Sequence, residues 1–321
     1  MDPAQLEFRD AVKRYPGADR NAVDHLSLTV PAGEICVLVG PSGCGKTTAM
    51  RMVNRMIDIT DGDILLGGAS VRERDPTRLR REIGYVIQQI GLFPHQTIGE
   101  NIATVPRLLG WERERVRART GELLELVGLD AELRDRYPAQ LSGGQRQRVG
   151  VARALAADPP LMLMDEPFGA IDPINRTRLQ NEFLRLQAEI RKTVVFVTHD
   201  IDEAIKMGDR VAIMREGGVL AQYGSPEEVL TRPADDFVAR FVGADRGLKR
   251  LALSRLADLD LQALNGHRPA LRLPDAMTVR DALSAMLTAD GTEALVVDGD
   301  DHEVGIVTVQ DVADLLSRES S

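Results

Sequence analysis

The sequence contains only two cysteines, Cys36 in an apolar run and Cys44 in a glycine-rich loop. These positions suit reduced thiols packed as small side chains better than a disulfide, and two thiols are too few to favour a metal site. The sequence also lacks a run of the ~18 apolar residues that a bilayer span requires, and residues 1–10 lack the basic-then-apolar plan of a secretory signal. We therefore expect a cytoplasmic protein that reaches a membrane only through a partner.

Positive charge is not in excess, because 49 acidic residues outnumber 40 Lys and Arg residues and give a net charge of -9. Binding to a phosphate backbone depends on an excess of Lys and Arg, so we do not expect nucleic acid as the main ligand. The sequence does contain 43% hydrophobic residues over 321 positions, enough for one large core and roughly two domains.

Short apolar runs that end in polar residues predict the inner strands of a parallel sheet. They occupy residues 35–39, 161–164 and 192–200, and a helical pattern over residues 175–190 separates the last two. Alternating strands and helices predict an α/β core in which ligands bind at the carboxyl ends of the strands. Between the two halves of that core, residues 97–148 favour helix and predict an inserted helical subdomain.

A domain boundary is expected near residues 243–247, where a weakly patterned stretch begins. It divides the chain into a first domain of residues 1–245, a linker of residues 246–269 and a small α/β region of residues 270–321. In this last region, two helical patterns flank two strand-like runs that are joined across the acidic turn at residues 298–301.

A glycine-rich loop follows the first predicted strand and fits the phosphate-loop pattern G-x-x-x-x-G-K-[ST] at every fixed position. Its glycines let backbone N–H groups approach phosphates, and the helix behind it directs its positive N-terminal dipole at the anion. We expect Lys46 to neutralise the β- and γ-phosphates of ATP and the Thr47 hydroxyl to hold Mg²⁺. The nucleotide-binding residues predicted here are Gly40, Pro41, Ser42, Gly43, Cys44, Gly45, Lys46, Thr47 and Thr48.

Three polar residues at the ends of the later strands are the predicted partners of this loop. Asp165 ends the strand over residues 161–164 and is expected to hold Mg²⁺ opposite Thr47. Glu166 follows directly, where it can orient or deprotonate an attacking water, so we predict it as the catalytic base. His199 ends the next strand, and we expect it to contact the γ-phosphate and the water; a purely structural histidine is the alternative.

A second glycine-rich segment, Ser142–Gln145, precedes a strong helical pattern and offers another helix N-terminus suited to phosphate. No lysine, magnesium ligand or base accompanies it, so Ser142, Gly143, Gly144 and Gln145 do not form an independent ATP site. We expect this segment to dock on the γ-phosphate held by another copy of the chain in a head-to-tail homodimer. ATP would then join the two subunits, and hydrolysis would release them.

Four motifs in this order, GPSGCGKTT, LSGGQRQRV, LMLMDEP and FVTHD, resemble those of the ATP-binding subunits of ABC transporters over residues 1–245. The resemblance implies a P-loop NTPase core with an inserted helical subdomain, and ATP and Mg²⁺ as cofactors. It implies that Gln88, rather than Gln89, is a catalytic glutamine that senses magnesium and water. It also implies that Tyr15 stacks on adenine and that Asp172 belongs to a loop that carries signals across the dimer; an ordinary surface tyrosine is the alternative for Tyr15.

The segments RMVNRM, GYVIQQIGLFPH and HDIDEAIKMGDR most closely resemble the ATPases of osmoprotectant importers, which take up glycine betaine, carnitine or choline. This resemblance implies transmembrane permease subunits and, indirectly, a substrate-binding protein as partners, with the ATPase peripheral at the cytoplasmic face of the plasma membrane. Residues 90 and 92–94 offer apolar and rigid groups where the family accepts a short permease helix, or else they are ordinary core residues.

The C-terminal region resembles one CBS motif, which residues 305–308 and Asp311 carry. Such motifs normally come in pairs that bind adenine nucleotides, but the chain has room for only one good copy. The motif is either a structural aid to dimerisation, completed by the second subunit, or a regulatory sensor.

Two other functions stay open at this point. One is a soluble ABC-type ATPase that acts on nucleic acid or ribosomes, although such chains usually carry a long coiled coil or two cassettes, and neither is present in the sequence. The other is a nucleotide-binding regulator with little turnover, which the presence of Lys46, Asp165, Glu166 and His199 opposes.

Overall fold

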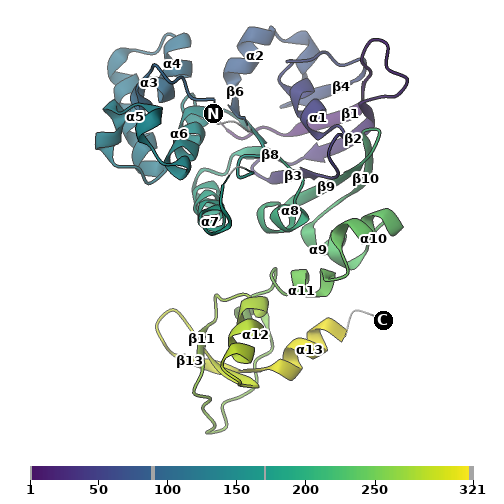
Figure 1. Cartoon of the computed structure of the whole chain (residues 1–321), viewed down its shortest axis with the longest axis vertical. Coiled ribbons are helices and arrows are strands. Elements are labelled where there is room, and N and C mark those ends of the chain that lie inside the picture. The colour runs from purple at the N-terminus through teal and green to yellow at the C-terminus, as the bar shows by residue number, and fades with distance from the viewer. Residues whose placement is uncertain (1, 88–90, 170, 318–321) are drawn as a thin grey trace. The chain divides into compact units, whose positions relative to one another are not determined.

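The computed structural model describes residues 2–87, 91–169 and 171–317, and the chain divides into two compact units, Met1–Tyr223 and Gly224–Ser321 (Figure 1). Each unit has its own hydrophobic core. The predicted α/β architecture is confirmed. The predicted boundaries at residues 245 and 269 stay predictions; within the stretch predicted as a linker, Leu251 and Leu256 belong to the core of the second unit.

The first unit contains a six-stranded sheet in the order β10-β9-β3-β8-β7-β6. Every residue of β3, β7 and β8 is buried, as expected for largely apolar runs in a sheet that is covered on both faces. β3, β8 and β7 pair in parallel, with Val39 opposite Thr198 and Asp165 opposite Val197, so the carboxyl ends of three neighbouring strands lie side by side. The strands are β3 (Ile35–Val39), β6 (Ile83–Val86), β7 (Leu161–Asp165), β8 (Thr193–Thr198), β9 (Arg210–Arg215) and β10 (Val219–Gly224).

A second, antiparallel sheet packs in the same core, and the sequence analysis did not predict it. Its order is β2-β1-β4-β5, formed by Val23–Val30, Leu6–Lys13, Asp61–Leu66 and Ala69–Ser70 respectively. Alternate residues of β2 are buried, which is the pattern of a strand with one face on the core. Helix α1 (Lys46–Val53) contributes Met50 and Met52 to the same cluster, so it packs with residues of both sheets.

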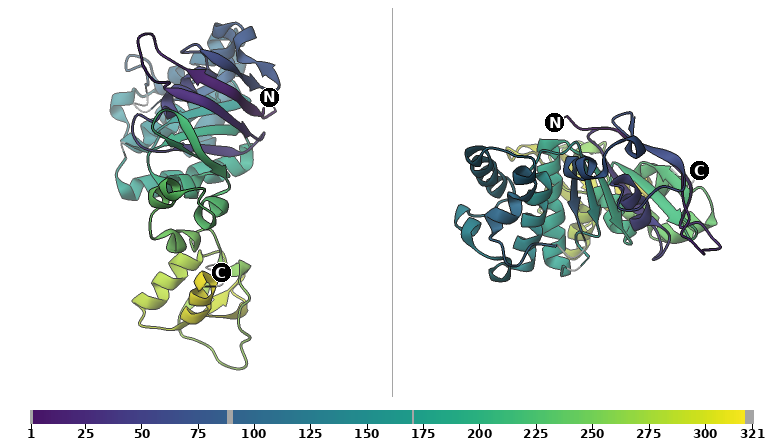
Figure 2. Two further views of the ribbon diagram at one scale, coloured as in Figure 1. Left: turned by 90° about the vertical axis from the view of Figure 1, so that its right-hand side faces the viewer. Right: turned by 90° about the horizontal axis from the view of Figure 1, so that it is seen from above.

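The helices α3 (Ile98–Ile102), α4 (Thr104–Leu108), α5 (Arg113–Leu126) and α6 (Gly143–Leu155) gather at one end of the six-stranded sheet, beyond β6 (Figures 1 and 2). They form the helical insertion that the sequence predicts. A capping box starts α3, because Thr97 and Glu100 each accept a hydrogen bond from the other's backbone N–H. The later helices of this unit are α7 (Pro173–Ile190) and α8 (Ile201–Met207), which flank β8 in sequence.

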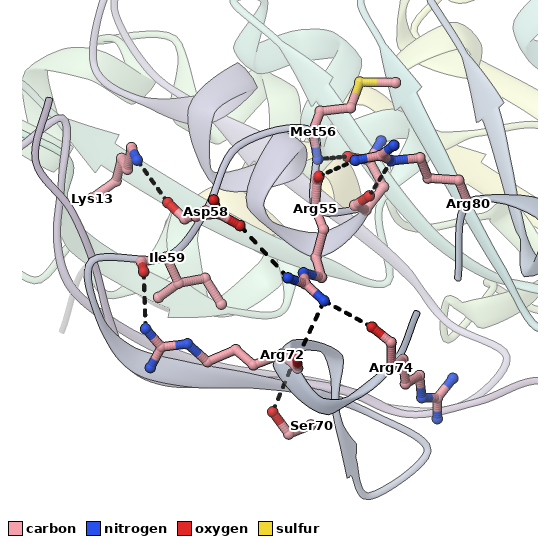
Figure 3. A network of polar contacts seen from close by, with 10 residues as sticks. Lys13, Arg55, Met56, Asp58, Ile59, Ser70, Arg72, Arg74 and Arg80 are labelled. Atoms are coloured by element: carbon pink, nitrogen blue, oxygen red, sulfur yellow. Dashed lines mark hydrogen bonds and ion pairs between the residues drawn. The ribbon is translucent and has the colours of Figure 1, made fainter. Parts of the chain in front are cut away.

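A network of arginine side chains fixes the loop that follows α1 (Figure 3). The Arg55 guanidinium donates to the carbonyl oxygens of Arg72 at 3.2 Å and Arg74 at 2.7 Å. Arg80, on α2 (Pro76–Glu82), donates to the carbonyl oxygen of Asn54 at 3.2 Å. The Arg80 bond satisfies the carbonyl group of Asn54, the residue that ends α1, and the Arg55 bonds tie the segment after α1 to residues 72 and 74. The helix whose other end carries the glycine-rich loop is therefore anchored.

The second unit begins with α9 (Pro226–Thr231), α10 (Asp236–Val242) and α11 (Arg246–Arg250). A three-stranded sheet follows, in the order β11-β12-β13, from Arg272–Pro274, Glu293–Val297 and Glu303–Thr308. Helices α12 (Val279–Thr288) and α13 (Val309–Ser317) complete the unit. At the start of α13, Asp311 accepts hydrogen bonds from the Thr308 backbone N–H and hydroxyl, both at 2.8 Å, so these two CBS-motif residues cap a helix.

Candidate functional site

The glycine-rich loop, residues 40–47, connects β3 to α1. At Gly45 the backbone has φ 94°, and a Cβ there would lie 2.1 Å from the Ala22 carbonyl oxygen, so only glycine fits. At Gly43 the backbone has φ 81°, and a Cβ would meet nothing within 4 Å. The loop is therefore tightly packed against the chain on one side and open at Gly43, where its backbone N–H groups can approach an anion.

Lys46 is buried at the base of this loop, with 6% of its surface exposed. Its Nζ donates to the carbonyl oxygens of Gly40 at 2.7 Å and Pro41 at 3.0 Å. Both acceptors are neutral, so these bonds orient the ammonium group without cancelling its charge. A buried cation held next to an open loop is suited to bind phosphate oxygens.

Asp165, at the end of β7, lies opposite Thr47, whose hydroxyl donates to its Oδ1 at 3.2 Å. Burial raises the pKa of the Asp165 carboxyl, while the hydrogen bond from Thr47 and the nearby charge of Arg51 act in the opposite direction. A carboxylate and a hydroxyl are hard oxygen ligands of the kind that Mg²⁺ takes, and the remaining ligands of such an ion normally come from water and the substrate phosphates. The two residues therefore fit a magnesium ion that binds together with a nucleotide.

Glu166 and His199 meet beside this pair. Glu166 Oε1 lies 3.3 Å from Nδ1 of His199, and the two side chains are 23% and 60% exposed. Glu166 adopts φ 42°, a left-handed conformation that is unusual for a residue with a side chain, and its N–H donates to the Val197 carbonyl oxygen of β8 at 2.9 Å. The structure thus brings together the predicted residues of three strand ends: residues 40–47, Asp165, Glu166 and His199, which we call the strand-end cluster.

The helix-tip segment, Ser142–Gln145, starts α6. The Ser142 hydroxyl accepts from the Gln145 N–H at 3.2 Å, and Gln145 Oε1 accepts from the Ser142 N–H at 2.9 Å, which forms a capping box. Ser142 and Gly143 are exposed. The first turn of a helix leaves backbone N–H groups without an intrahelical acceptor, so this tip presents donors and a dipole suited to an anion outside it.

Comparisons with known proteins agree with this geometry. Residues 23–169 match the ABC transporter family, and residues 266–318 match the CBS domain family. The osmoprotectant import ATP-binding protein OsmV of Salmonella typhimurium is 52% identical over 91% of this chain and 75% of its own length. The glycine betaine uptake system ATP-binding protein YehX of Escherichia coli is 46% identical over 96% of this chain and 98% of its own length. The chain belongs to the family of ABC transporter ATP-binding proteins.

Solved structures of the family share the fold of this ABC ATPase. An ATP-binding cassette solved as a dimer in a post-hydrolysis state, bound to ADP and Pi, superposes with a TM-score of 0.60 at 32% identity and covers 69% of this chain and 98% of its own. The predictions of family, of the P-loop fold with a C-terminal CBS domain, and of ATP as the nucleotide are confirmed.

Two predicted nucleotide contacts of the ABC ATPase lie outside the strand-end cluster. Tyr15 is 42% exposed on the loop after β1, and the Lys13 ammonium lies 5.2 Å from the centre of its ring. The Ala22 N–H closes this loop by donating to the Lys13 carbonyl oxygen at 2.7 Å, and Ala22 in turn abuts Gly45. The loop that carries Tyr15 therefore ends against the phosphate loop.

Asp172 is exposed and caps α7. Its Oδ1 accepts from the Asn175 N–H at 3.1 Å, and its Oδ2 accepts from the Asn175 side-chain amide at 2.8 Å. The Asn175 side chain and backbone hydrogen bonds lower the pKa of the Asp172 carboxyl, so it is ionised at neutral pH. Like Ser142, it is a polar group at an exposed helix start.

The predicted glutamine Gln88, its neighbour Gln89 and Ile90 lie outside the residues that the structure describes. Next to them, Phe93 is 41% exposed and Pro94 is exposed, while Leu92 is half-buried. Within the described part of the chain, every helix is too short or too polar to span a bilayer.

Sequence reasoning missed the residue that holds this exposed segment. Asn101 is fully buried on α3; its Oδ1 accepts from the Phe93 N–H at 2.8 Å, and its Nδ2 donates to the Phe93 carbonyl oxygen at 3.2 Å. The sequence carries no motif for this contact. The only available signal was a polar residue between Ile98 and Ile102 on the apolar side of a short helix.

Proposed function

We propose that this chain is the ATP-hydrolysing, energy-coupling subunit of an importer of quaternary-amine osmoprotectants such as glycine betaine, carnitine or choline. The relatives OsmV and YehX support the substrate class, because they are ATP-binding proteins of osmoprotectant import and of glycine betaine uptake. The observation that carries the mechanism is the separation of two half-sites: a strand-end cluster with lysine, carboxylates and histidine, and an exposed helix tip that has none of these.

In the proposed reaction, the loop N–H groups and Lys46 hold the β- and γ-phosphates of ATP. Mg²⁺, held by Thr47, Asp165 and Gln88, would neutralise phosphate charge when bound. Glu166 accepts a proton from the water whose oxygen attacks the γ-phosphorus, as the bond from that phosphorus to the ADP oxygen breaks. His199 orients the Glu166 carboxylate through the 3.3 Å contact and reaches the γ-phosphate from its exposed position.

The helix-tip segment completes the site in a head-to-tail homodimer. Ser142, Gly143, Gly144 and Gln145 of one subunit donate to the γ-phosphate held by the other, Asp172 lies on the loop between the two sites, and Tyr15 stacks on the adenine. The net effect is that ATP favours the closed dimer and hydrolysis favours its release. In this proposal, transmembrane permease subunits contact the chain at the exposed Phe93 and Pro94 and respond to the closing and opening of the dimer. A binding protein delivers the transported solute to the permease. The chain itself is then a peripheral protein at the cytoplasmic face of the plasma membrane.

The test is reconstitution of the chain in liposomes together with the permease and the binding protein of the proposed importer. We expect ATP hydrolysis to rise when the binding protein carries glycine betaine, and labelled glycine betaine to enter the vesicles only with ATP. A parallel assay with Glu166→Gln measures uptake that does not depend on this site. A rate of ATP hydrolysis that does not change when the loaded binding protein is added would favour the non-transport ATPase instead. Tight and salt-sensitive binding to nucleic acid would favour it as well.

A further inference from the structure

A buried polar cluster joins the two helices that follow segments of the site. Gln180 on α7 and Glu203 on α8 are 5% and 8% exposed. Gln180 Nε2 donates to Glu203 Oε1 at 2.9 Å, and Lys206 Nζ donates to Gln180 Oε1 at 3.0 Å. The Gln180 side chain therefore donates through its amide nitrogen and accepts through its amide oxygen inside the protein.

Keeping this cluster buried has a free-energy cost. A buried carboxyl and amide lose the free energy of hydration, and hydrogen bonds inside the protein compensate for only part of this loss. Burial raises the pKa of Glu203, and hydrogen bonds from Thr198 and Gln180 oppose the shift. Apolar side chains of similar volume would join two helices at a lower free-energy cost. Hydrogen bonds, unlike apolar contacts, require a fixed orientation of the two helices, so this arrangement suggests that the orientation itself has a role.

The segments that this orientation controls are those at which the two helices begin. α8 starts directly after Thr198 and His199, and its cap Asp200 accepts from the Glu203 N–H at 3.3 Å. α7 starts at Asp172, and one turn along it Arg176 donates to the carbonyl oxygen of Ile171 at 3.1 Å. Gln180 lies one turn further along the same helix. A hydrogen bond between Gln180 and Glu203 thus links the segment that carries Asp172 to the segment that carries His199.

We infer that Gln180 and Glu203 are positioning residues of the ATPase: their hydrogen bond holds α8 against α7 and so sets His199 for its contact with Glu166. The inference rests on the proposed role of His199 in hydrolysis. It assigns a purpose to two buried residues that bind neither phosphate nor metal in the proposed mechanism.

The first test is Gln180→Leu, which removes both hydrogen bonds at nearly constant volume. Because a small misplacement of a catalytic group is costly, we expect kcat for ATP to fall at least about tenfold while KM for ATP stays within about twofold. Glu203→Gln keeps an acceptor oxygen for Gln180 and should retain kcat near that of the parent. Gln180→Asn keeps the amide but shortens its reach by one methylene, so it provides a second variant that should also lower kcat.

Gln187→Leu is the matched control. Gln187 is on the same helix, is 7% exposed, and its Nε2 donates to the carbonyl oxygens of Lys192 and Gly33 near the amino end of β8, away from His199. Its replacement should lower the free energy of unfolding, as measured by urea titration, but leave kcat near the parent value. Equal losses of kcat in Gln187→Leu and Gln180→Leu would show a general loss of stability and overturn the inference.

The second test repeats Gln180→Leu in a His199→Ala background. If Gln180 acts through His199, its replacement should cause little further loss of kcat there. An equal loss in both backgrounds would overturn the positioning role alone and leave the role of His199 intact. Full kcat in His199→Ala itself would refute the proposed role of His199, and this inference with it.

Discussion

The strand-end cluster draws its residues from three neighbouring strands, whereas the helix-tip segment is one continuous run whose polar groups bond one another. Lys46 and Asp165 of the cluster are buried, with 6% and 7% of their surfaces exposed, but Ser142 and Gly143 of the tip face outward. In the proposed function, the two regions bind the same phosphate anion under opposite conditions of burial.

This difference separates what each region can do alone. The cluster holds Lys46 and Asp165 at reduced dielectric, where charges interact strongly with one another, and Glu166 is its proposed base. The exposed tip offers neutral donors that water can also satisfy, so it gains most when a second surface excludes water. We expect the cluster to determine the affinity for ATP and the rate of hydrolysis. We expect the tip to contribute only when a second subunit is bound.

Among the variants that separate the roles of the two regions, Glu166→Gln should have the largest effect on ATP hydrolysis. It removes the proposed base and leaves the phosphate-binding groups in place. We expect kcat to fall by ~10²–10⁴-fold while ATP affinity is retained. Size-exclusion chromatography with light scattering should show a dimer that persists in excess ATP. Glu189→Gln, at an exposed position on α7, is the control and should leave hydrolysis unchanged. A variant that stays monomeric in ATP would contradict the shared site.

A mixing experiment tests whether the tip works across subunits. Ser142→Arg should abolish hydrolysis by placing bulk, and a second positive charge next to the partner's Lys46, where the short serine would dock. Lys46→Ala should lose nucleotide affinity. Mixed dimers of the two variants contain one intact composite site, so hydrolysis should return in proportion to the mixed fraction. Ser142→Thr keeps the capping hydroxyl and should stay active. If the mixture is no more active than its components, the tip does not act in trans.

Removal of the Tyr15 ring should have a smaller effect, since this residue is exposed and lies outside the buried cluster. Loss of a stacking contact of ~0.5–1.5 kcal/mol would weaken ATP binding by about 2- to 10-fold. Tyr15→Ala and the control Tyr15→Phe can be compared by titration with a fluorescent ATP analogue. Unchanged affinity in Tyr15→Ala would make it an ordinary surface tyrosine.

The smallest expected effect concerns stability rather than activity. Burial raises the pKa of Glu203 above its usual value of 4.5, so the folded state holds this proton more tightly than the unfolded state. The contribution of Glu203 to stability is therefore greatest at acid pH and falls as the pH rises from about 4.5 through the raised pKa. The Tm of the parent relative to Glu203→Gln should fall over that range, by ~2–4 °C for each ~1 kcal/mol. A Tm difference that does not change with pH would mean that Glu203 keeps an ordinary pKa.

The buried region was predictable from the sequence to a large extent. Strand β3 and the start of α1 coincide with the predicted limits at residues 35–39 and 46, because an apolar run, a glycine loop and a helical period follow one another there. The meeting of Asp165 and Glu166 with that loop follows from the rule that parallel strands end at one edge.

The remainder depends on contacts between distant residues. Strand β2 carries the alternation of a one-sided strand. Strand β1, however, pairs with β4 as well as with β2, with Leu6 opposite Leu66 and Val12 opposite Asp61, and no local pattern specifies this long-range pairing. Two contacts likewise depend on how side chains are placed in the folded chain. They are the 3.3 Å contact between His199 and Glu166 and the hydrogen bond that the Asn101 side chain accepts from the Phe93 N–H. The helix-tip cap was predictable in kind, since Ser142 and Gln145 have the spacing of a capping box.

At Ala22 three stretches of backbone come together with no room for an added carbon: a Cβ on Gly45 or on Gly218 would lie within 2.4 Å of the Ala22 carbonyl oxygen. The curvature of the phosphate loop is thus dictated by how closely its neighbours are spaced. A cradle shaped in this way is rigid before any ligand arrives, so ATP loses little binding free energy to ordering it. A methyl group at Gly218, which lies outside the predicted phosphate contacts, should therefore weaken nucleotide binding through the shape of the loop alone.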